Sequence, residues 1–391
     1  MFNIGSKNYN LTISDENSFQ VFQKHAEINN LHSFINEQPV YPEWRENIQK
    51  MEFIRAIQGT IALEGSELEV DDVQRIANQE KPSDSDKDRE AENALLAYEF
   101  IQEWSANNPD GEITESVIKQ LHTIMTRGIS YYLNEPGIYR NQPVEFGYPK
   151  QKSVLMNRFD VEDAMARVVV LINQKASTSF NYSSFPITKA IISHYFMTFI
   201  HPFIDGNGRV SRAVEALILH HYGNFEPYFF PVSASFYYKE RKKYFELLRN
   251  VDDTGEPFPF ISFAIDGLYQ NLSEIKKHLL DQITRTLILD YAHQLRRQKK
   301  ILKRQTTLLE NMFYLNPMEL SEFWRKPGIR AIYLKLSDST RKRDLAKLDE
   351  YKFVKFSKAS SSQERKRSFV EINWDVLRMV TIRLDKIPHR P

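Results

Sequence analysis

The chain has 391 residues, of which 41% are hydrophobic, 26% are charged and none is cysteine. This length suggests two or three structural units, each long enough to bury a core, and the composition is that of a globular rather than a disordered protein. The lack of cysteine excludes a disulfide scaffold, a thiolate zinc site and a cysteine nucleophile. No run of about 18 apolar residues occurs and the N-terminal segment lacks the pattern of a secretory signal, so we expect a cytoplasmic protein without a membrane partner.

Charge is unevenly distributed along the chain. The net charge is only +1, but residues 291–391 hold 24 Lys and Arg against 11 Asp and Glu, whereas residues 1–290 hold 28 against 40. A basic C-terminal unit therefore follows an acidic body, which predicts two parts with different partners.

Most of the chain has the hydrophobic period of helices, which predicts a mainly α fold. In chain order, helices are expected from near Pro42 to Gly65 and at 94–102, 117–125, 160–174, 186–200 and 207–222. Residues 137–158 interrupt this pattern with Gly, Pro and alternating apolar residues, which is typical of an extended hairpin. In the basic unit, a helix near 305–314 and a second helix capped by Ser337 precede two extended segments, 351–357 and 367–374.

The turn expected before the helix at 207–222 concentrates groups that bind phosphate. Its sequence, HPFIDGNGRVSR, occupies residues 201–212. Gly206 and Gly208 let the backbone approach a ligand closely, and the first N–H groups of the following helix favour an anion. Asn207 is placed to donate to a phosphate oxygen from the same turn.

The charged residues of this segment complete a site for a nucleotide. Asp205 is an oxygen ligand of the kind that Mg²⁺ uses when water and phosphates hold most of the ion. Arg209 and Arg212 are three residues apart, so they share one helix face and suit a polyphosphate. His201 can take a proton from an incoming hydroxyl at neutral pH. Singly these residues are common in caps, turns and solvated faces, but together they indicate phosphoryl or nucleotidyl transfer.

These residues resemble the Fic-domain proteins. HPFIDGNGR matches in full the family signature His-Pro-Phe-x-(Asp/Glu)-Gly-Asn-(Gly/Lys)-Arg, and Arg212 extends the match. Leu121 with His122, the segment 137–140 and the block 257–265 also look like the family's flanking elements. The resemblance implies a helical bundle with a β-hairpin flap that transfers AMP from ATP, with Mg²⁺, to a Ser, Thr or Tyr hydroxyl of a protein, including self-modification.

The resemblance also assigns roles by position. His201 would be the base and Asp205 the Mg²⁺ ligand. The α- and β-phosphates would be held by Gly206, Asn207 and Gly208, the β-phosphate region by Arg209 and the γ-phosphate by Arg212. The hairpin near 138–155 would be the flap that aligns the target by strand addition.

Several aromatic and imidazole side chains fall outside the signature. Tyr244 either faces the adenine or is a plain core aromatic. No recognised ligand spacing suggests a second metal site, and we interpret the following histidines as structural: His122, His194, His220 and His221.

A second motif lies upstream, where Thr60 to Gly65 matches the family's inhibitory signature (Ser/Thr)-x-x-x-Glu-(Gly/Asn). By resemblance, Glu64 would pair with Arg212 and remove the cation that should hold the γ-phosphate. In some relatives the same glutamate supports AMP removal, so the alternative activity is de-AMPylation. A non-enzymatic alternative is a nucleotide-sensing transcription regulator.

The expected organisation has four parts. They are an N-terminal helical region with the inhibitory motif (1–109), the Fic core (110–272), a helical linker (273–304) and a small α+β unit that resembles a winged helix (305–391). The last unit is predicted to bind either DNA, through its basic charge, or a protein, including a second copy in a homodimer.

Overall fold

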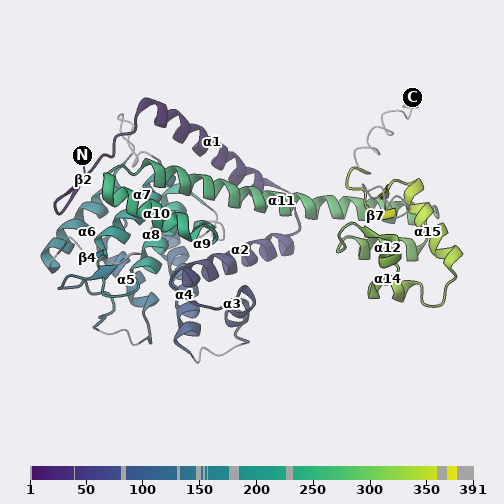
Figure 1. Cartoon of the computed structure of the whole chain (residues 1–391), viewed down its shortest axis with the longest axis horizontal. Helices are drawn as coiled ribbons and strands as arrows, with labels where there is room; N and C mark the ends of the chain where they lie inside the picture. The colour runs from purple at the N-terminus through teal and green to yellow at the C-terminus, as the bar shows by residue number, and fades with distance from the viewer. Residues whose placement is uncertain are drawn as a thin grey trace. The chain divides into compact units, whose positions relative to one another are not determined.

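The structure is a computed structural model that describes residues 2–38, 40–80, 85–129, 133–146, 151–152, 155, 157–175, 185–225, 232–358 and 368–376. The chain divides into two compact units, Met1–Lys276 and Lys277–Pro391 (Figure 1). Among the described residues, no helix has both the length and the apolar character needed to cross a membrane.

The first unit begins with a short antiparallel ribbon and four helices. These are β1 (Phe2–Ile4), β2 (Lys7–Tyr9), α1 (Asp15–Glu37), α2 (Pro42–Leu63), α3 (Val70–Ala77) and α4 (Asp86–Asn107). Ser14 and Ser85 cap α1 and α4 by accepting hydrogen bonds from backbone N–H groups of the first turn. Helix α2 starts with Pro42 at its first position and ends before Gly65, whose φ is +91°.

The rest of the first unit is the helical bundle that carries the signature motif. It comprises α5 (Glu115–Met125), β3 (Glu145–Phe146), β4 (Gln151–Lys152), α6 (Arg158–Asn173), α7 (Pro186–Ile200), α8 (Asn207–Gly223), α9 (Val232–Lys239), α10 (Arg241–Thr254) and the first part of α11 (Phe258–Arg297).

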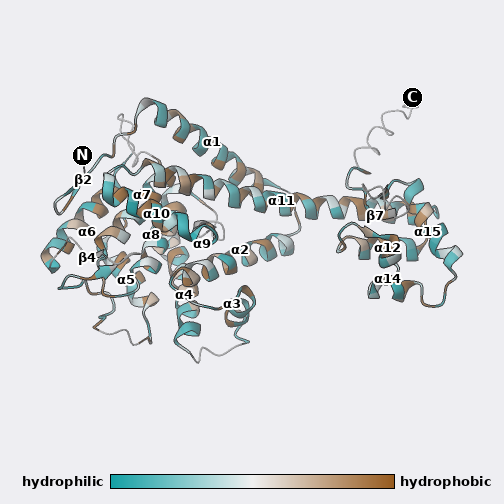
Figure 2. Cartoon of the chain, viewed as in Figure 1, coloured by the Kyte–Doolittle hydropathy of each residue, from teal (hydrophilic) through white to brown (hydrophobic). Residues whose placement is uncertain are grey.

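Helices α7 and α8 form the centre of the bundle, because nearly all residues of α7 and most residues of α8 are buried. Outer helices such as α1 carry hydrophilic and hydrophobic residues along their length (Figure 2). Helix α2 packs on α9, and Gly59 makes this close approach feasible, since a Cβ there would lie 2.8 Å from the Ala234 carbonyl oxygen.

The second unit has its own core. After α12 (Lys303–Met312) come β5 (Met318–Glu319), α13 (Leu320–Phe323), α14 (Pro327–Ile332), α15 (Asp338–Glu350), β6 (Val354–Lys358) and β7 (Ser368–Ile372). The strands form an antiparallel sheet in the order β5-β7-β6, with Phe356 opposite Val370. Buried Asp344 accepts hydrogen bonds from Arg304, Gln305 and Tyr333, so its charge is paired inside this core.

The mainly α fold expected from the hydrophobic period is confirmed, and the helices expected at 160–174, 186–200 and 207–222 lie within two residues of α6, α7 and α8. The interrupted segment does contain an antiparallel pair, in which Glu145 lies opposite Lys152. The division between the two units falls inside α11, which continues to Arg297. The finer boundaries expected at residues 110 and 305 stay predictions.

Candidate functional site

The loop between α7 and α8 is held in an unusual backbone conformation. His201 ends α7 with φ 50° and ψ 62°, in the left-handed region that side chains other than glycine rarely adopt. Gly206 begins α8 with φ 76°. The side-chain amide of Asn207 closes the loop, because it accepts from the N–H of Phe203 and donates to the Phe203 carbonyl, both at 2.9 Å. The Asn207 side chain is thus engaged within the loop, and the phosphate contact predicted for Asn207 stays a prediction.

The imidazole of His201 is arranged to accept a proton. Its Nδ1 lies 3.3 Å from the carbonyl oxygen of Thr198. Since a carbonyl only accepts, Nδ1 carries the proton and Nε2 is the acceptor. Burial, together with the charge of Arg140, lowers the pKa of His201 to about 4. The ring is therefore neutral at pH 7, as a general base requires.

Asp205 and Arg209 lie at the mouth of the loop. Oδ1 of Asp205 accepts from the N–H of Gly206 at 2.5 Å and lies 3.4 Å from Nη2 of Arg209. The Asp205 side chain is 46% exposed, and partial burial raises its pKa even though the Gly206 N–H and the Arg209 charge lower it.

A carboxylate that the sequence did not single out also contacts Arg209. Glu90 of α4 lies with Oε1 3.4 Å from Nη1 of Arg209, and both side chains are buried. Glu90 belongs to no motif, so only the packing of α4 on α8 reveals this contact.

One carboxylate at the loop fits a Mg²⁺ that is held mainly by phosphates and water. Asp205 presents a half-exposed carboxylate beside the N-terminus of α8, where phosphate would bind. The described residues contain no group of three or more His, Asp or Glu that would hold a metal without a substrate. The donor set is therefore compatible with a metal that arrives with a nucleotide.

Arg212 and Glu64 form the predicted pair. Nη2 of Arg212 lies 2.7 Å from Oε1 of Glu64, and Thr60 accepts from the same guanidinium through its hydroxyl at 2.7 Å and its carbonyl at 2.9 Å. Arg212 is 3% exposed and the Glu64 side chain 37%. Burial would raise the pKa of Glu64, but the charge and the hydrogen bond of Arg212 and the charge of Arg209 together outweigh it, so the pKa is lowered and the carboxylate is ionised at pH 7.

The Glu64 carboxylate rests on the first turn of α8. A Cβ on Gly208 would lie 2.1 Å from Oε1 of Glu64. Glu64 thus occupies space over the helix N-terminus, which is where a bound anion would contact the backbone N–H groups.

Tyr244 lies in the core beside Arg212. It is 1% exposed, its ring stacks on Tyr237 with centroids 4.8 Å apart, and its hydroxyl lies 2.9 Å from Nε2 of His194. Contact with adenine stays a prediction for Tyr244.

Two further side chains tie the signature loop to the hairpin. His122 accepts from the N–H of Gly137 at 2.8 Å, donates to the Asp205 carbonyl at 3.1 Å and stacks on Phe203. Arg140 donates to four backbone carbonyls, those of Gln142, Leu155, Ile200 and His201. The sequence indicated Arg140 only as part of the resemblance, and it indicated His122 both there and among the histidines interpreted as structural, because a donor to distant carbonyls has no local pattern.

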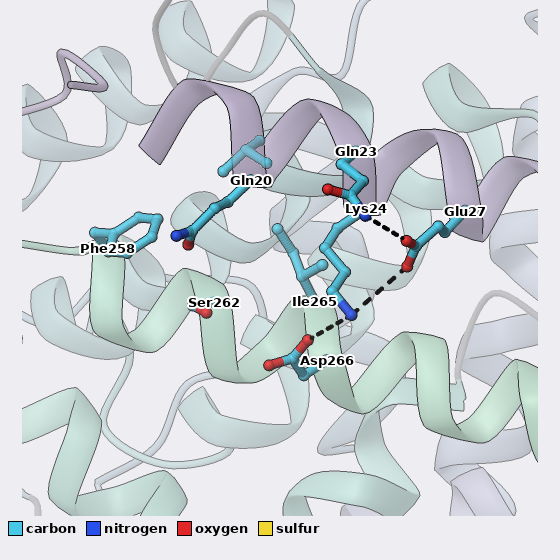
Figure 3. A pocket seen from close by; sticks show the side chains of 9 residues that line it. Gln20, Gln23, Lys24, Glu27, Phe258, Ser262, Ile265 and Asp266 are labelled. Carbon is cyan, nitrogen blue, oxygen red and sulfur yellow. Dashed lines mark hydrogen bonds and ion pairs between the residues drawn. The ribbon is translucent and has the colours of Figure 1, made fainter. Parts of the chain in front are cut away.

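Two cavities occur among the described residues of the first unit. One cavity of about 250 Å³ lies at the base of the hairpin and is lined by residues that include Ile138, Arg140 and Ile204. Another of about 220 Å³ lies between α1 and α11, where Lys24 pairs with Glu27 and Asp266 (Figure 3). Among the described residues that line the second cavity, none is a predicted site residue.

Comparison with known proteins places this geometry in a family. Residues 112–219 match the model of the Fic/DOC family. Protein adenylyltransferase Fic of Drosophila ananassae is 26% identical over 225 residues, which cover 56% of this chain and 40% of that protein. Protein adenylyltransferase fic-1 of Caenorhabditis elegans is 30% identical over 128 residues, 31% of this chain and 23% of that protein. The chain therefore spans less than half the length of these curated relatives.

Solved structures show the same fold. A Fic family protein from Desulfovibrio desulfuricans superposes with a TM-score of 0.57 at 19% identity, covering 93% of this chain and 97% of that one. Fic-1 from C. elegans gives a TM-score of 0.53 at 19% identity, covering 67% of this chain and 73% of that one. The signature loop between α7 and α8 and the family match identify a Fic domain at residues 112–219 of this chain, and the solved structures share its helical fold.

Proposed function

We propose that this protein transfers AMP from ATP to a Ser, Thr or Tyr hydroxyl of a target protein. The observation that carries the proposal is the orientation of the partly buried His201 beside the N-terminus of α8, where Nδ1 faces the Thr198 carbonyl and Nε2 provides a proton acceptor next to an anion site. The curated relatives are named protein adenylyltransferases, which supports this reaction over other phosphoryl transfers.

In the proposed step, the target hydroxyl oxygen forms a bond to the α-phosphorus and the bond to the bridging oxygen breaks. Pyrophosphate leaves with that electron pair, and the hydroxyl proton passes to Nε2 of His201. The backbone N–H groups of Gly206, Asn207 and Gly208 hold the α- and β-phosphates. Mg²⁺, held by Asp205, neutralises phosphate charge when it is bound.

The two arginines contact different phosphates of the bound nucleotide. By resemblance to the family, Arg209 serves the β-phosphate region and Arg212 the γ-phosphate, and their spacing on one face of α8 suits a polyphosphate. Glu64 restrains this reaction because it pairs with Arg212 in the structure. A charged hydrogen-bonded pair is worth about 1.5 to 3 kcal/mol, so it would suppress turnover roughly ten- to a hundredfold.

The test uses ATP labelled separately at the α- and γ-phosphates, with Glu64→Gly and His201→Ala variants. We expect Glu64→Gly to retain α-label on protein, and no γ-label, at a level ten- to a hundredfold above the unsubstituted chain. Label from the γ-phosphate would contradict AMP transfer. If Glu64→Gly instead loses the ability to release AMP from a modified target, the glutamate supports de-AMPylation.

We further propose that the second unit is a winged-helix-like binding module. Its element order, with α12, α14 and α15 around the sheet β5-β7-β6, and its excess of basic residues support this. Binding of the full chain to duplex DNA that weakens steeply with salt would favour a DNA partner. No DNA binding at low salt would favour a protein partner.

A further inference from the structure

The last turn of α2, which leads directly into Glu64, ends in carbonyl groups that the helix itself cannot satisfy. In an α-helix the last four carbonyls have no intrahelical donor. In α2 these are the carbonyls of residues 60–63. Backbone N–H groups that follow the helix donate to the carbonyls of Ile61 at 3.1 Å and Ala62 at 3.0 Å. The local chain therefore satisfies two of these carbonyls, and those of residues 60 and 63 need donors from elsewhere.

Two arginines from other helices supply these donors. Nη2 of Arg212, on α8, donates to the Thr60 carbonyl at 2.9 Å. Nη2 of Arg241, the first residue of α10, donates to the Leu63 carbonyl at 3.2 Å. The last turn of α2 contains no basic residue of its own. The C-terminal end of a helix carries partial negative charge, so both cations are favourably placed there.

The two arginines act on different parts of the same residue pair. Glu64 follows Leu63 directly, so a carboxylate stands at the end of a helix where negative charge is unfavourable. Arg212 lies 2.7 Å from this carboxylate. The Arg241 guanidinium, which lies 5.8 Å from the centre of the Phe245 ring one turn along α10, holds the neighbouring carbonyl. Arg241 therefore acts on the backbone next to Glu64, whereas Arg212 acts on its carboxylate.

We infer that Arg241 is a positioning residue for the inhibitory pair, because its hydrogen bond to the Leu63 carbonyl keeps the last turn of α2 where Glu64 reaches Arg212. This inference rests on the proposed function and adds to it a residue outside the inhibitory motif. Loss of the hydrogen bond favours the state in which Glu64 has left Arg212 and the γ-phosphate can bind. A residue that acts in this way affects AMP transfer only while Glu64 is present.

The test measures AMP transfer from α-labelled ATP by the full chain, with and without Arg241→Met, in the presence of Glu64 and in the Glu64→Gly background. Methionine keeps an aliphatic stem and removes the donor. With Glu64 present, Arg241→Met should raise AMP transfer about threefold, in the lower part of the range for one hydrogen bond because Arg241 is exposed. In the Glu64→Gly background the same substitution should change transfer by less than about 1.5-fold.

Two further variants separate this role from a general effect of charge. Arg241→Lys keeps a cation that can donate to a carbonyl, so it should raise transfer by less than Arg241→Met does. The matched control, Arg249→Met, removes an exposed arginine of the same helix that lies 3.7 Å from Asp253. It should leave AMP transfer unchanged in both backgrounds.

Hydrogen exchange provides a readout that needs no catalysis. The N–H groups of Gly65 and Ser66 donate to carbonyls of α2 at 3.0 and 3.1 Å. If Arg241 holds the last turn, Arg241→Met should make both groups exchange about threefold faster, while N–H groups in the middle of α2 keep their rates. Unchanged exchange at both positions would overturn the inference.

The outcomes distinguish the inference from the proposed function. If Glu64→Gly transfers AMP, but Arg241→Met leaves transfer unchanged or alters it equally in both backgrounds, the inference fails and the proposed function stands. If Glu64→Gly transfers no AMP, the proposed function fails, and the exchange rates alone decide whether Arg241 holds the end of α2.

Discussion

His201 shows at the scale of one residue how the fold prepares a group for chemistry. Its left-handed backbone is disfavoured by about 1 to 2 kcal/mol for an L-residue, and the surrounding loop contacts must offset that strain. The Thr198 carbonyl orients the ring, and burial keeps it neutral. His201 therefore combines a strained backbone with an oriented, neutral ring that is prepared to take a proton.

Replacement of the His201 side chain should lower the rate of AMP transfer without lowering the affinity for ATP. We expect His201→Ala, in a Glu64→Gly background, to lower AMP transfer by about 10² to 10⁴, the usual contribution of a general base, while ATP binding is retained. Label transfer and calorimetry measure the two effects. The control His220→Ala removes a histidine bonded to the Phe225 carbonyl at the far end of α8, and it should leave transfer unchanged. Full transfer by His201→Ala would contradict the proposed base.

At the scale of elements, Arg140 joins the hairpin segment to the signature loop. The Arg140 guanidinium donates hydrogen bonds to a carbonyl before β3, a carbonyl after β4 and the carbonyl of the last residue of α7. The loop geometry therefore depends on a side chain outside the signature. Its burial lowers the pKa of Arg140 to about 10, so it stays charged at pH 7.

Loss of this guanidinium should affect both stability and catalysis. Arg140→Met leaves buried carbonyls without their donor, so we expect the free energy of unfolding to fall by about 3 kcal/mol and AMP transfer to fall at least about tenfold. Urea denaturation and label transfer provide the measurements. The control Arg167→Ala removes an exposed pair with Asp163 on α6, which should change stability by less than about 0.5 kcal/mol. Equal effects of both variants would refute the role of Arg140.

At the scale of the whole molecule, the buried His25 and His122 and the partly buried His201 make stability depend on pH. Burial lowers the pKa values of His25, His122 and His201 from 6.5 to about 4. Below pH 6.5 the unfolded chain binds protons that the folded chain does not bind. Their contribution to stability is therefore complete above pH 6.5 and is lost as the pH falls from 6.5 towards 4.

This linkage predicts that the free energy of unfolding decreases measurably as the pH falls. Each histidine should remove at most about 3 kcal/mol between pH 6.5 and 4, because one pKa unit corresponds to about 1.36 kcal/mol. Urea unfolding at pH 7.5, 6 and 5 should show a steadily smaller free energy. His122→Asn should reduce the proton uptake on unfolding by about one in this window. Constant stability from pH 7.5 to 5 would show that these histidines are not buried as neutral rings.

Features that depend on neighbours along the chain could be predicted from the amino-acid sequence alone. The signature residues from His201 to Arg212 are contiguous, so their role as a phosphate-binding turn follows from local backbone chemistry. The hydrophobic period likewise predicted α6, α7 and α8, because a helix face repeats every 3.6 residues. The Glu64 and Arg212 pair, 148 residues apart, was predicted only through resemblance to a family.

Contacts between polar groups that are distant in the sequence depend on the packing of the folded chain. Glu90 reaches Arg209, His122 reaches Asp205, and Tyr244 reaches His194, across separations of up to 119 residues that no period in the sequence reports. Such contacts depend on how helices pack, and each buried polar atom pairs with whichever partner the packing presents. For that reason the residues of the phosphate turn were predictable, whereas the side chains that hold them in place were not.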